Sequence, residues 1–214
     1  SELVGKCHNC EASFVLYSPF EKEKEFIAPE WKNNTKLNEN VVKWFESRMI
    51  SQKVLNDMKI YSDIEYMPQI SKETSVVCFP FFRNGKLINI KYRTGDKKFK
   101  LFKDAELILY NIDSIVDSKE VVIVEGEIDC LSYIPVGIDF VVSVPNGAGT
   151  NLTYLDSCIE LFENKEKIYL ATDNDSKGIG LRDELLRRFG QEKCLIVNFK
   201  DCKDANQYLT TYGG

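Results

Sequence analysis

The clearest indication of the fold is Val-Val-Ile-Val-Glu-Gly-Glu-Ile-Asp-Cys, residues 121–130. Its β-branched run stops abruptly at carboxylates and a glycine, which is typical of a buried parallel strand whose carboxyl end carries chemistry. The same break recurs at residues 168–178, which read Ile-Tyr-Leu-Ala-Thr-Asp-Asn-Asp-Ser-Lys-Gly. In open α/β sheets the site lies outside the carboxyl ends of the strands, so Glu125, Asp173 and Asp175 are expected to meet there.

The second half of the chain alternates between strands and helices. The pattern predicts strands at 121–124, 140–144, 168–172 and 195–199, and helices at 127–134, 151–163, 178–189 and 204–211. Such alternation implies right-handed crossovers and a parallel sheet with helices on both faces. The fold class expected for residues 116–214 is therefore α/β.

Residues 37–115 show a different pattern, which predicts a small α+β subdomain. Helices are expected at 38–49 and 51–58, and strands at 76–82, 86–92 and 98–102. Arg83-Asn84-Gly85 predicts a hairpin turn, because Asn-Gly tolerates positive φ. The boundary to the α/β part is expected near residue 115.

Composition and charge limit the class of protein. Of 214 residues, 43% are hydrophobic and 29% are charged, an ordinary soluble mixture, and we expect neither a membrane span nor a signal peptide. The net charge is −5, yet residues 83–103 carry +7, which leaves −12 for the rest of the chain. This basic strip holds eight cations, Arg83, Lys86, Lys91, Arg93, Lys97, Lys98, Lys100 and Lys103, against one acid, Asp96. A basic strip beside an acidic site indicates that the protein handles phosphates.

The cysteines favour a reducing compartment. Seven are present, an odd number, and several lie within apolar stretches, which is typical of free thiols in a cytosol. Cys7 and Cys10 have the spacing of one half of a zinc ribbon, but no second pair follows. We interpret residues 1–36 as the remnant of a zinc-ribbon module and a linker, and expect zinc only in a longer intact protein.

The acids at the strand ends are candidate metal ligands. Carboxylates gathered in one place repel each other unless a cation joins them, and hard oxygen ligands favour Mg²⁺ or Mn²⁺. The expected ligand set is Glu125, Asp129, Asp173, Asp175 and Asp204. Two alternatives stay open: Asp204 could be only a helix N-cap, and an Asp-x-Asp pair is common in solvated surface turns. Glu125 fits neither alternative well, because glutamate is a poor cap and interrupts a buried run.

Three further features are candidates for phosphate binding. Gly178 is expected to begin a helix whose free N–H groups, together with Lys177, would bind a phosphate. Asn146 and Gly147 lie in a glycine-bearing turn after the second strand. The lysines of the basic strip could instead form a solvated face of the hairpin that prevents its edge from pairing with another strand. That interpretation fits Lys91-Tyr92-Arg93 least.

These motifs resemble those of a Toprim domain. Val-Glu-Gly-Glu-Ile-Asp, then Asp-Asn-Asp, then Cys-Lys-Asp-Ala-Asn are similar to the acidic motifs of the primase half of phage primase–helicases and Twinkle-like proteins. Supporting matches are Ser47-Arg48-Met49-Ile50-Ser51, Ile90-Lys91-Tyr92-Arg93, Lys98-Phe99 and Ser143-Val-Pro-Asn-Gly-Ala. The resemblance covers roughly residues 37 to 210, most of the chain.

The resemblance implies roles for these residues. Glu125 would be a metal ligand or general base, Asp173 and Asp175 would hold the divalent metal, and Asp129 and Asp204 would line the same site. Further residues are expected to contact nucleotide phosphate or template: Lys91, Arg93, Lys98, Lys177, Asn146 and Gly147.

The resemblance also implies a function. It favours a DNA primase that makes short primers on single-stranded DNA from nucleoside triphosphates, with Mg²⁺ or Mn²⁺ as cofactor and a replicative helicase module in cis or in trans. No Gly-x-x-x-x-Gly-Lys-Ser/Thr motif for a helicase occurs in the chain. A Toprim nuclease and a non-catalytic DNA-binding or scaffold module remain alternatives. The expected location is a bacterial cytoplasm, in a phage or prophage protein.

Overall fold

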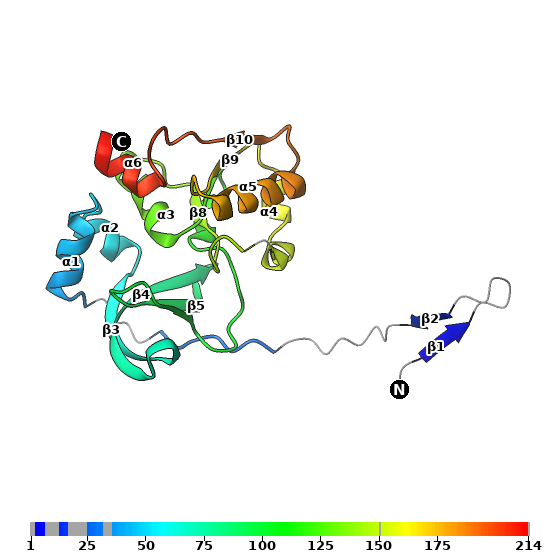
Figure 1. Ribbon diagram of the computed structural model, residues 1–214, viewed down its shortest axis with the longest axis horizontal. Coiled ribbons are helices and arrows are strands. Elements are labelled where there is room, and N and C mark those ends of the chain that lie inside the picture. Colours follow the sequence, from blue (N-terminus) through cyan, green and yellow to red (C-terminus); the bar gives the residue numbers. More distant parts are fainter. Residues whose placement is uncertain (1–2, 7–12, 17–24, 32–35, 150, 214) are drawn as a thin grey trace.

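Two four-stranded sheets organise the chain in the computed structural model, which describes residues 3–6, 13–16, 25–31, 36–149 and 151–213. Figure 1 shows the helix-covered parallel sheet on one side and the antiparallel sheet on the other. The antiparallel hairpin of β1 (Leu3–Lys6) and β2 (Ser13–Leu16) precedes both sheets. Cys7 and Cys10, which have the spacing of one half of a zinc ribbon, lie outside the described residues.

The parallel sheet has the strand order β10-β9-β7-β8. Its strands are β7 (Glu120–Val124), β8 (Val141–Ser143), β9 (Lys167–Ala171) and β10 (Cys194–Ile196), and all neighbours pair in parallel. Each strand overlaps a predicted one, and the α/β fold class is confirmed. β10 is shorter than predicted, because the chain leaves the sheet after Ile196.

Helices cover both faces of this sheet. The chain runs from β7 to β8 on one side and then back across β7 to β9, so right-handed crossovers place α3 on one face and α4 and α5 on the other. The helices are α3 (Glu127–Tyr133), α4 (Glu160–Glu163), α5 (Ser176–Phe189) and α6 (Ala205–Tyr212), with the 3₁₀ helix η3 (Ile134–Val136) after α3. α6 packs beside α3, and Phe162 of α4 stacks on Phe189 of α5.

The long helix predicted at 151–163 is wrong. The segment forms a 3₁₀ helix, η4 (Thr153–Ser157), and the single turn of α4, separated at Cys158, whose φ is −139°. Leu152, Tyr154 and Leu155 are buried in this segment. The φ of −139° at Cys158 lies outside the α-helical range, so one helix does not run through the segment.

The antiparallel sheet has the order β3-β4-β5-β6. Its strands are β3 (Tyr61–Met67), β4 (Lys72–Arg83), β5 (Lys86–Arg93) and β6 (Phe99–Leu101), followed along the chain by the 3₁₀ helix η2 (Ile112–Ile115). β4 and β5 form the predicted hairpin, in which Asn84 and Gly85 have positive φ. β3 was not predicted, because its apolar Ile64 is 68% exposed and the alternation of the strand is hard to recognise.

The antiparallel sheet is strongly curved, so that its two edge strands, β3 and β6, approach each other. The side chain of Gln69, in the 3₁₀ helix η1 (Pro68–Ile70) after β3, donates to the Phe99 carbonyl at 2.6 Å. Lys100 of β6 donates to the Tyr66 carbonyl of β3 at 2.8 Å. A small apolar core fills the curl, made of Tyr61, Met67, Val76, Cys78, Ile90 and Tyr92.

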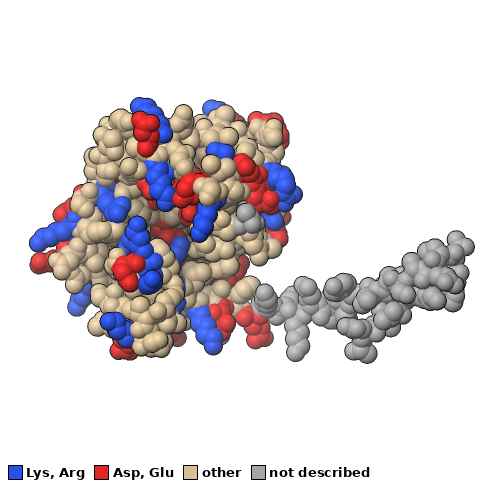
Figure 2. All heavy atoms as spheres, in the orientation of Figure 1, with Lys and Arg blue, Asp and Glu red and all other residues tan. Residues whose placement is uncertain are grey.

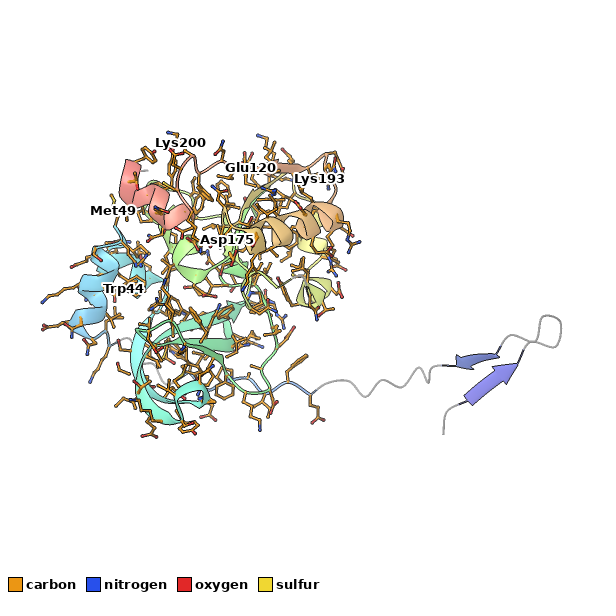
Figure 3. All side chains as sticks on the ribbon, in the orientation of Figure 1. Trp44, Met49, Glu120, Asp175, Lys193 and Lys200 are labelled. Atoms are coloured by element: carbon orange, nitrogen blue, oxygen red, sulfur yellow. The ribbon has the colours of Figure 1, made fainter. Side chains whose placement is uncertain are left out.

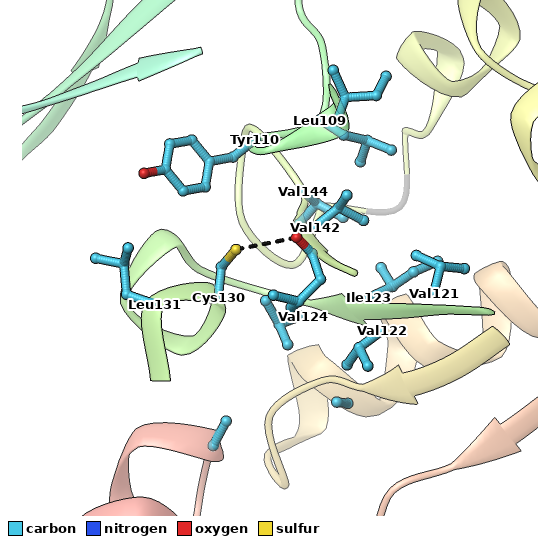
Figure 4. Close-up of a cluster of buried hydrophobic side chains, with 14 of the residues drawn as sticks. Leu109, Tyr110, Val121, Val122, Ile123, Val124, Cys130, Leu131, Val142 and Val144 are labelled. Atoms are coloured by element: carbon cyan, nitrogen blue, oxygen red, sulfur yellow. Dashed lines mark hydrogen bonds between the residues drawn. The ribbon is translucent and has the colours of Figure 1, made fainter. Parts of the chain in front are cut away.

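The main hydrophobic core is continuous across residue 115. Helices α1 (Glu39–Glu46) and α2 (Gln52–Asp57), which begin at the caps Asn38 and Ser51, contribute Phe45 and Leu55. Figure 4 shows Leu109 and Tyr110 in the same buried cluster as Val121 to Val124 of β7. The Cys130 thiol donates to the Val141 carbonyl. Tyr110 also pairs with Ser143 of β8. The domain boundaries 1–36, 37–115 and 116–214 stay a prediction.

No helix among the described residues has both the length and the apolar character needed to cross a bilayer.

Candidate metal- and nucleotide-binding cleft

A cleft of about 490 Å³ lies between the carboxyl ends of the parallel strands and the antiparallel sheet. One wall carries the acids Glu125, Asp129, Asp173 and Asp204, and the facing wall carries Arg48, Lys91, Arg93, Lys97 and Lys100. Figure 2 shows basic and acidic side chains beside each other around a hollow in this face. A cleft of this size is in the range of small-molecule sites.

Glu125 follows β7 directly and is half-buried in the cleft. Burial raises the pKa of its carboxyl group from 4.5 to about 7, and the nearby charges of Asp173 and Asp175 add to the rise. Its Oε2 atom is buried and has no hydrogen-bond partner among the described residues. An ionised carboxylate in this position requires a cation.

Asp173 and Asp175 lie in the loop between β9 and α5. Gly178 makes this loop possible, because a Cβ atom at residue 178 would lie 2.2 Å from the Asp173 carbonyl oxygen. Thr172 donates from its hydroxyl to the Gly178 carbonyl at 2.8 Å and closes the turn. Burial raises the pKa of Asp173, although an ion pair with Lys203 opposes the rise.

Asp175 is the N-cap of α5. Figure 3 labels it near the middle of the view, at the start of that helix. Its Oδ1 atom accepts from the backbone N–H groups of Lys177 and Gly178 at 3.0 Å each, and these bonds hold the pKa of its carboxyl group below the ordinary value. The free N–H groups expected at Lys177 and Gly178 are therefore already bonded. Lys177 itself is exposed and does not line the cleft.

Lys203 connects the two aspartates. Its Nζ atom lies 3.0 Å from Asp173 Oδ2 and 3.2 Å from Asp175 Oδ2, and these contacts raise the pKa of the lysine. Backbone bonds align the loops that carry these residues, because the Asn174 N–H donates to the Lys203 carbonyl at 2.7 Å and the Asn174 side chain donates to the Cys202 carbonyl at 2.9 Å. A lysine ammonium thus occupies a cation position between two carboxylates.

Asp204 and Asp129 complete the acidic wall. Asp204 is the N-cap of α6, accepting from the Gln207 N–H at 2.8 Å, so its capping role and its place in the cleft are compatible. Asp129 accepts from the Asn206 N–H at 3.3 Å. Burial raises the pKa of Asp129 well above its ordinary value, and repulsion from Asp204 and Asp173 adds to this effect.

Asn206 links the acidic wall to α1. Its side chain accepts from Arg48 Nη1 at 2.6 Å and donates to the Arg48 carbonyl at 3.1 Å and to Ser132 Oγ at 2.9 Å. The Arg48 guanidinium lies over the ring of Trp44, 4.6 Å from its centroid. Arg48 is thereby held at the edge of the cleft.

The basic wall is buried where β5 ends. Lys91 is 8% exposed and Arg93 5%, so neither belongs to a solvated face. Lys91 forms an ion pair with Glu127 of α3 at 2.9 Å, and Glu127 is 4% exposed. Arg93 lies over Trp44 at 4.6 Å, and burial, together with the charge of Arg48, lowers its pKa. Arg93 Nε is buried without a hydrogen-bond partner in the described part of the chain, although the residue lines the cleft.

Of the other residues predicted for the site, only some line the cleft. Asn146 and Gly147 line the cleft. Lys98 is exposed and lies outside the lining, where its backbone N–H donates to Thr94 Oγ1 at 3.0 Å. Asp175 reaches the lining only through Lys203.

Three charged residues that line the cleft were not predicted as site residues from the sequence: Arg48, Glu127 and Lys203. Each stood inside a quoted motif, namely Ser-Arg-Met, Glu-Gly-Glu and Cys-Lys-Asp-Ala-Asn. Arg48 bonds to Asn206, 158 residues away, and Glu127 bonds to Lys91, 36 residues away. Lys203 contacts Asp173, 30 residues away, and Asp175. Only the folded structure reveals these partners.

The donor set fits a hard divalent cation. No group of three or more His, Cys, Asp or Glu side chains stands ready-arranged as a metal site in the described ranges. Two observations nevertheless show that a cation fits: the unpartnered Oε2 of Glu125 and the ammonium held by Asp173 and Asp175. Oxygen donors of this kind suit Mg²⁺ or Mn²⁺.

Residues 122–209 match the model of the family described as Toprim-like. The Primase homolog protein of Arabidopsis thaliana is 30% identical over 223 residues, which cover 95% of this chain and 64% of that protein. The Twinkle homolog protein, chloroplastic/mitochondrial, of the same plant is 31% identical over 234 residues, which cover 98% of this chain and 32% of that protein. The chain thus spans less than two thirds of either relative.

Solved structures show the same fold. The primase fragment of the bacteriophage T7 primase-helicase protein superimposes with a TM-score of 0.63 at 21% identity, covering 95% of this chain and 84% of that one. The Aquifex aeolicus primase, with its zinc-binding and RNA polymerase domains, has a TM-score of 0.63 at 17% identity, covering 82% and 53%. The resemblance predicted from the motifs is confirmed: the chain carries a Toprim-like domain with a primase-like fold and is homologous to the Primase homolog and Twinkle homolog proteins.

Proposed function

We propose that the chain is the primer-synthesising RNA polymerase domain of a phage-type DNA primase, acting on single-stranded DNA by metal-dependent nucleotidyl transfer. The observation that supports this most strongly is the cleft, in which an acidic wall faces a basic wall. A metal–triphosphate complex combines a cation with an anion, so the two walls match its two parts. The homologous primase and Twinkle relatives support the same reaction class.

Glu125, Asp173 and Asp175 would hold the divalent ion, with Asp129 and Asp204 lining the same site. The chemistry that Mg²⁺ or Mn²⁺ supplies here is neutralisation of phosphoryl charge and a lower pKa for the attacking 3′-hydroxyl. Glu125 is suited to this role because its buried oxygen lacks a partner. The hydrogen bonds at the start of α5 fix Asp175, which leaves its Oδ2 atom pointing toward the site.

The basic wall would bind the triphosphate or the template backbone. Arg93 is the best-placed residue, since its buried guanidinium has an unsatisfied N–H group and stacks on Trp44. Lys91 contributes beside it with Glu127 as a counter-ion, and Lys98 extends the basic surface outside the cleft. Guanidinium groups bind phosphate through charge-assisted hydrogen bonds. Asn146 and Gly147, which line the cleft, and Lys177, which lies outside its lining, complete the proposed nucleotide-binding set.

Primer synthesis on single-stranded DNA with ribonucleotides and Mg²⁺ or Mn²⁺ tests the proposal. Asp173→Ala should lower the rate of dinucleotide formation about 10³-fold or more, because a metal ligand contributes several kcal/mol to lowering the barrier. Asp183→Ala is the matched control, because it removes a carboxylate from the exposed side of α5. Full activity of Asp173→Ala, with Asp183→Ala equally active, would remove the proposed role.

A non-catalytic DNA-binding or scaffold module is the second candidate. One observation favours it, namely that an ammonium already occupies the position between Asp173 and Asp175. Calorimetry with Mn²⁺ separates the two, since no heat at millimolar metal favours the scaffold. A Toprim nuclease would shorten the DNA in the same assay in which a primase makes oligomers.

The proposed partners are single-stranded DNA, nucleoside triphosphates and a replicative helicase module in cis or in trans. The proposed compartment is a reducing one, such as a bacterial cytoplasm, because Cys78, Cys130, Cys158, Cys194 and Cys202 are free thiols. A zinc module in a longer form of the protein, which would use Cys7 and Cys10, belongs to the same proposal.

A further inference from the structure

The side chain of Lys203 is held by charge, whereas its backbone is held by hydrogen bonds. The Lys203 carbonyl accepts from the Asn174 N–H at 2.7 Å, and the Lys203 N–H donates to the Gln207 side chain at 2.7 Å. These bonds fix the loop against both α5 and α6. The side chain is 54% exposed, so it can swing away without disturbing that backbone.

The ammonium and a divalent ion need the same oxygen atoms. Asp175 Oδ1 is already committed to two N–H groups at the start of α5, so only Oδ2 remains for a cation. That Oδ2 atom lies 3.2 Å from Lys203 Nζ, and Asp173 Oδ2 lies 3.0 Å from the same nitrogen. A metal that takes both oxygens must displace the ammonium.

Without any cation these carboxylates would repel each other in a partly buried site. Glu125 adds a third charge, and the charges of Asp173 and Asp175 both act on it. A tethered ammonium relieves that repulsion and keeps the Asp173 and Asp175 side chains turned toward each other. It therefore orders the site in the absence of metal and weakens metal binding at the same time.

We propose that Lys203 is a resident counter-ion that competes with the divalent ion for Asp173 and Asp175 and leaves when the metal binds. This inference rests on the proposed function in one respect, namely that the site takes Mg²⁺ or Mn²⁺. Lys203 is a positioning residue, because it acts on the carboxylates and not on substrate.

Direct Mn²⁺ binding to the whole chain, measured by electron paramagnetic resonance and by calorimetry, tests the proposal. Lys203→Met should bind Mn²⁺ about tenfold tighter than the wild type, which corresponds to about 1.4 kcal/mol. Lys200→Met is the matched control, because it removes the same unit charge from a nearby lysine that packs over Tyr208 and Tyr212. Its affinity should stay within about twofold of the wild type, since an exposed charge is screened.

Thermal unfolding gives a second readout. In EDTA the Lys203→Met protein should melt below the wild type, because its carboxylates have lost their counter-ion, and Mn²⁺ should raise its melting temperature more than it raises that of the wild type. Lys203→Gln, which keeps a polar side chain, serves the same comparison if the methionine variant does not fold.

The outcomes separate this inference from the proposed function. Equal Mn²⁺ affinity in the wild type and the Lys203 variants would overturn the counter-ion role and leave the metal site in place. An equal gain in Lys200→Met would also overturn it, because the effect would then be one of net charge. Absence of Mn²⁺ binding at millimolar concentration in every protein would overturn both proposals.

Discussion

Replacing Glu125 with glutamine should stabilise the metal-free protein at high pH and leave it unchanged at low pH. Burial raises the pKa of the Glu125 carboxyl group from 4.5 to about 7, with Asp173 and Asp175 adding to the rise. The unfolded chain releases this proton near its ordinary pKa, whereas the folded protein retains it until about pH 7. The raised pKa therefore contributes stability that is present below pH 4.5 and is lost as pH rises through about 7.

The magnitude follows from the two pKa values. One pKa unit is worth about 1.4 kcal/mol, so the wild type should lose up to about 3 kcal/mol of unfolding free energy across this range. The figure is an upper bound, because water reaches part of the half-buried carboxyl group. In a domain of this size each kcal/mol shifts the melting temperature by about 2 to 4 °C. Glutamine does not titrate, so the variant should escape this loss.

Urea unfolding in EDTA at pH 5, 6, 7 and 8 measures the effect. The difference between Glu125→Gln and the wild type should grow with pH, while Glu163→Gln, an exposed carboxylate of α4, should show no such growth. Asp129 and Asp173 also have raised pKa values, but both are present in every protein compared. Saturating Mg²⁺ at pH 8 should stabilise the wild type more than the variant. A difference that is the same at pH 5 and pH 8 would refute the reasoning.

Three further predictions concern the loop that carries Asp173 and the basic wall of the cleft. Gly178→Ala should destabilise the protein by about 1–3 kcal/mol in urea unfolding, because its Cβ would meet backbone at 2.2 Å, whereas Gly180→Ala has open space and should be neutral or stabilising. Lys91→Met should cost about 3–5 kcal/mol by leaving Glu127 buried without its counter-ion, and adding Glu127→Leu should restore most of that stability, which a double-mutant cycle measures. Phe99, which is 43% exposed on the cleft wall, should stack on bases: Phe99→Ala should weaken single-stranded DNA binding by about 1–3 kcal/mol in fluorescence anisotropy, and Phe99→Trp should retain it. Equal affinity of the alanine and tryptophan variants would contradict the stacking role.

The parallel sheet could be predicted because its signals are local. The run Val121 to Val124 is buried on both faces, so its sequence is continuously apolar and ends where the backbone reaches the cleft. The same reasoning located the strands at β8 and β9 to within one residue at each end. The positions of Glu125 and Asp173 follow from the strand ends alone, since parallel neighbours finish at one edge.

Features that depend on distant partners could not be predicted in this way. Tyr66 and Ile64 of β3 face outward and are exposed, so β3 lacks the alternation that identifies a half-buried strand. The segment 151–163 divides at Cys158 into η4 and α4, because the φ of −139° at Cys158 lies outside the helical range. The lysine between Asp173 and Asp175 is visible only when the loops before α5 and α6 are brought together.

The ion pair between Lys91 and Glu127 explains how the two walls are aligned. Lys91 belongs to the antiparallel sheet and Glu127 to the first turn of α3, so their 2.9 Å contact joins the basic wall directly to the turn that carries Glu125. Because both partners are buried, the pair is maintained only in the correct geometry, and its members neutralise each other. The positive charge that faces the acids then comes from the other cations of the basic wall, among them Arg93 and Arg48, whose guanidinium groups have no carboxylate bound to them among the described residues. Under the proposed function, a triphosphate entering the cleft would meet these guanidinium groups on one side and, on the other, the Lys203 ammonium that we propose leaves when metal binds.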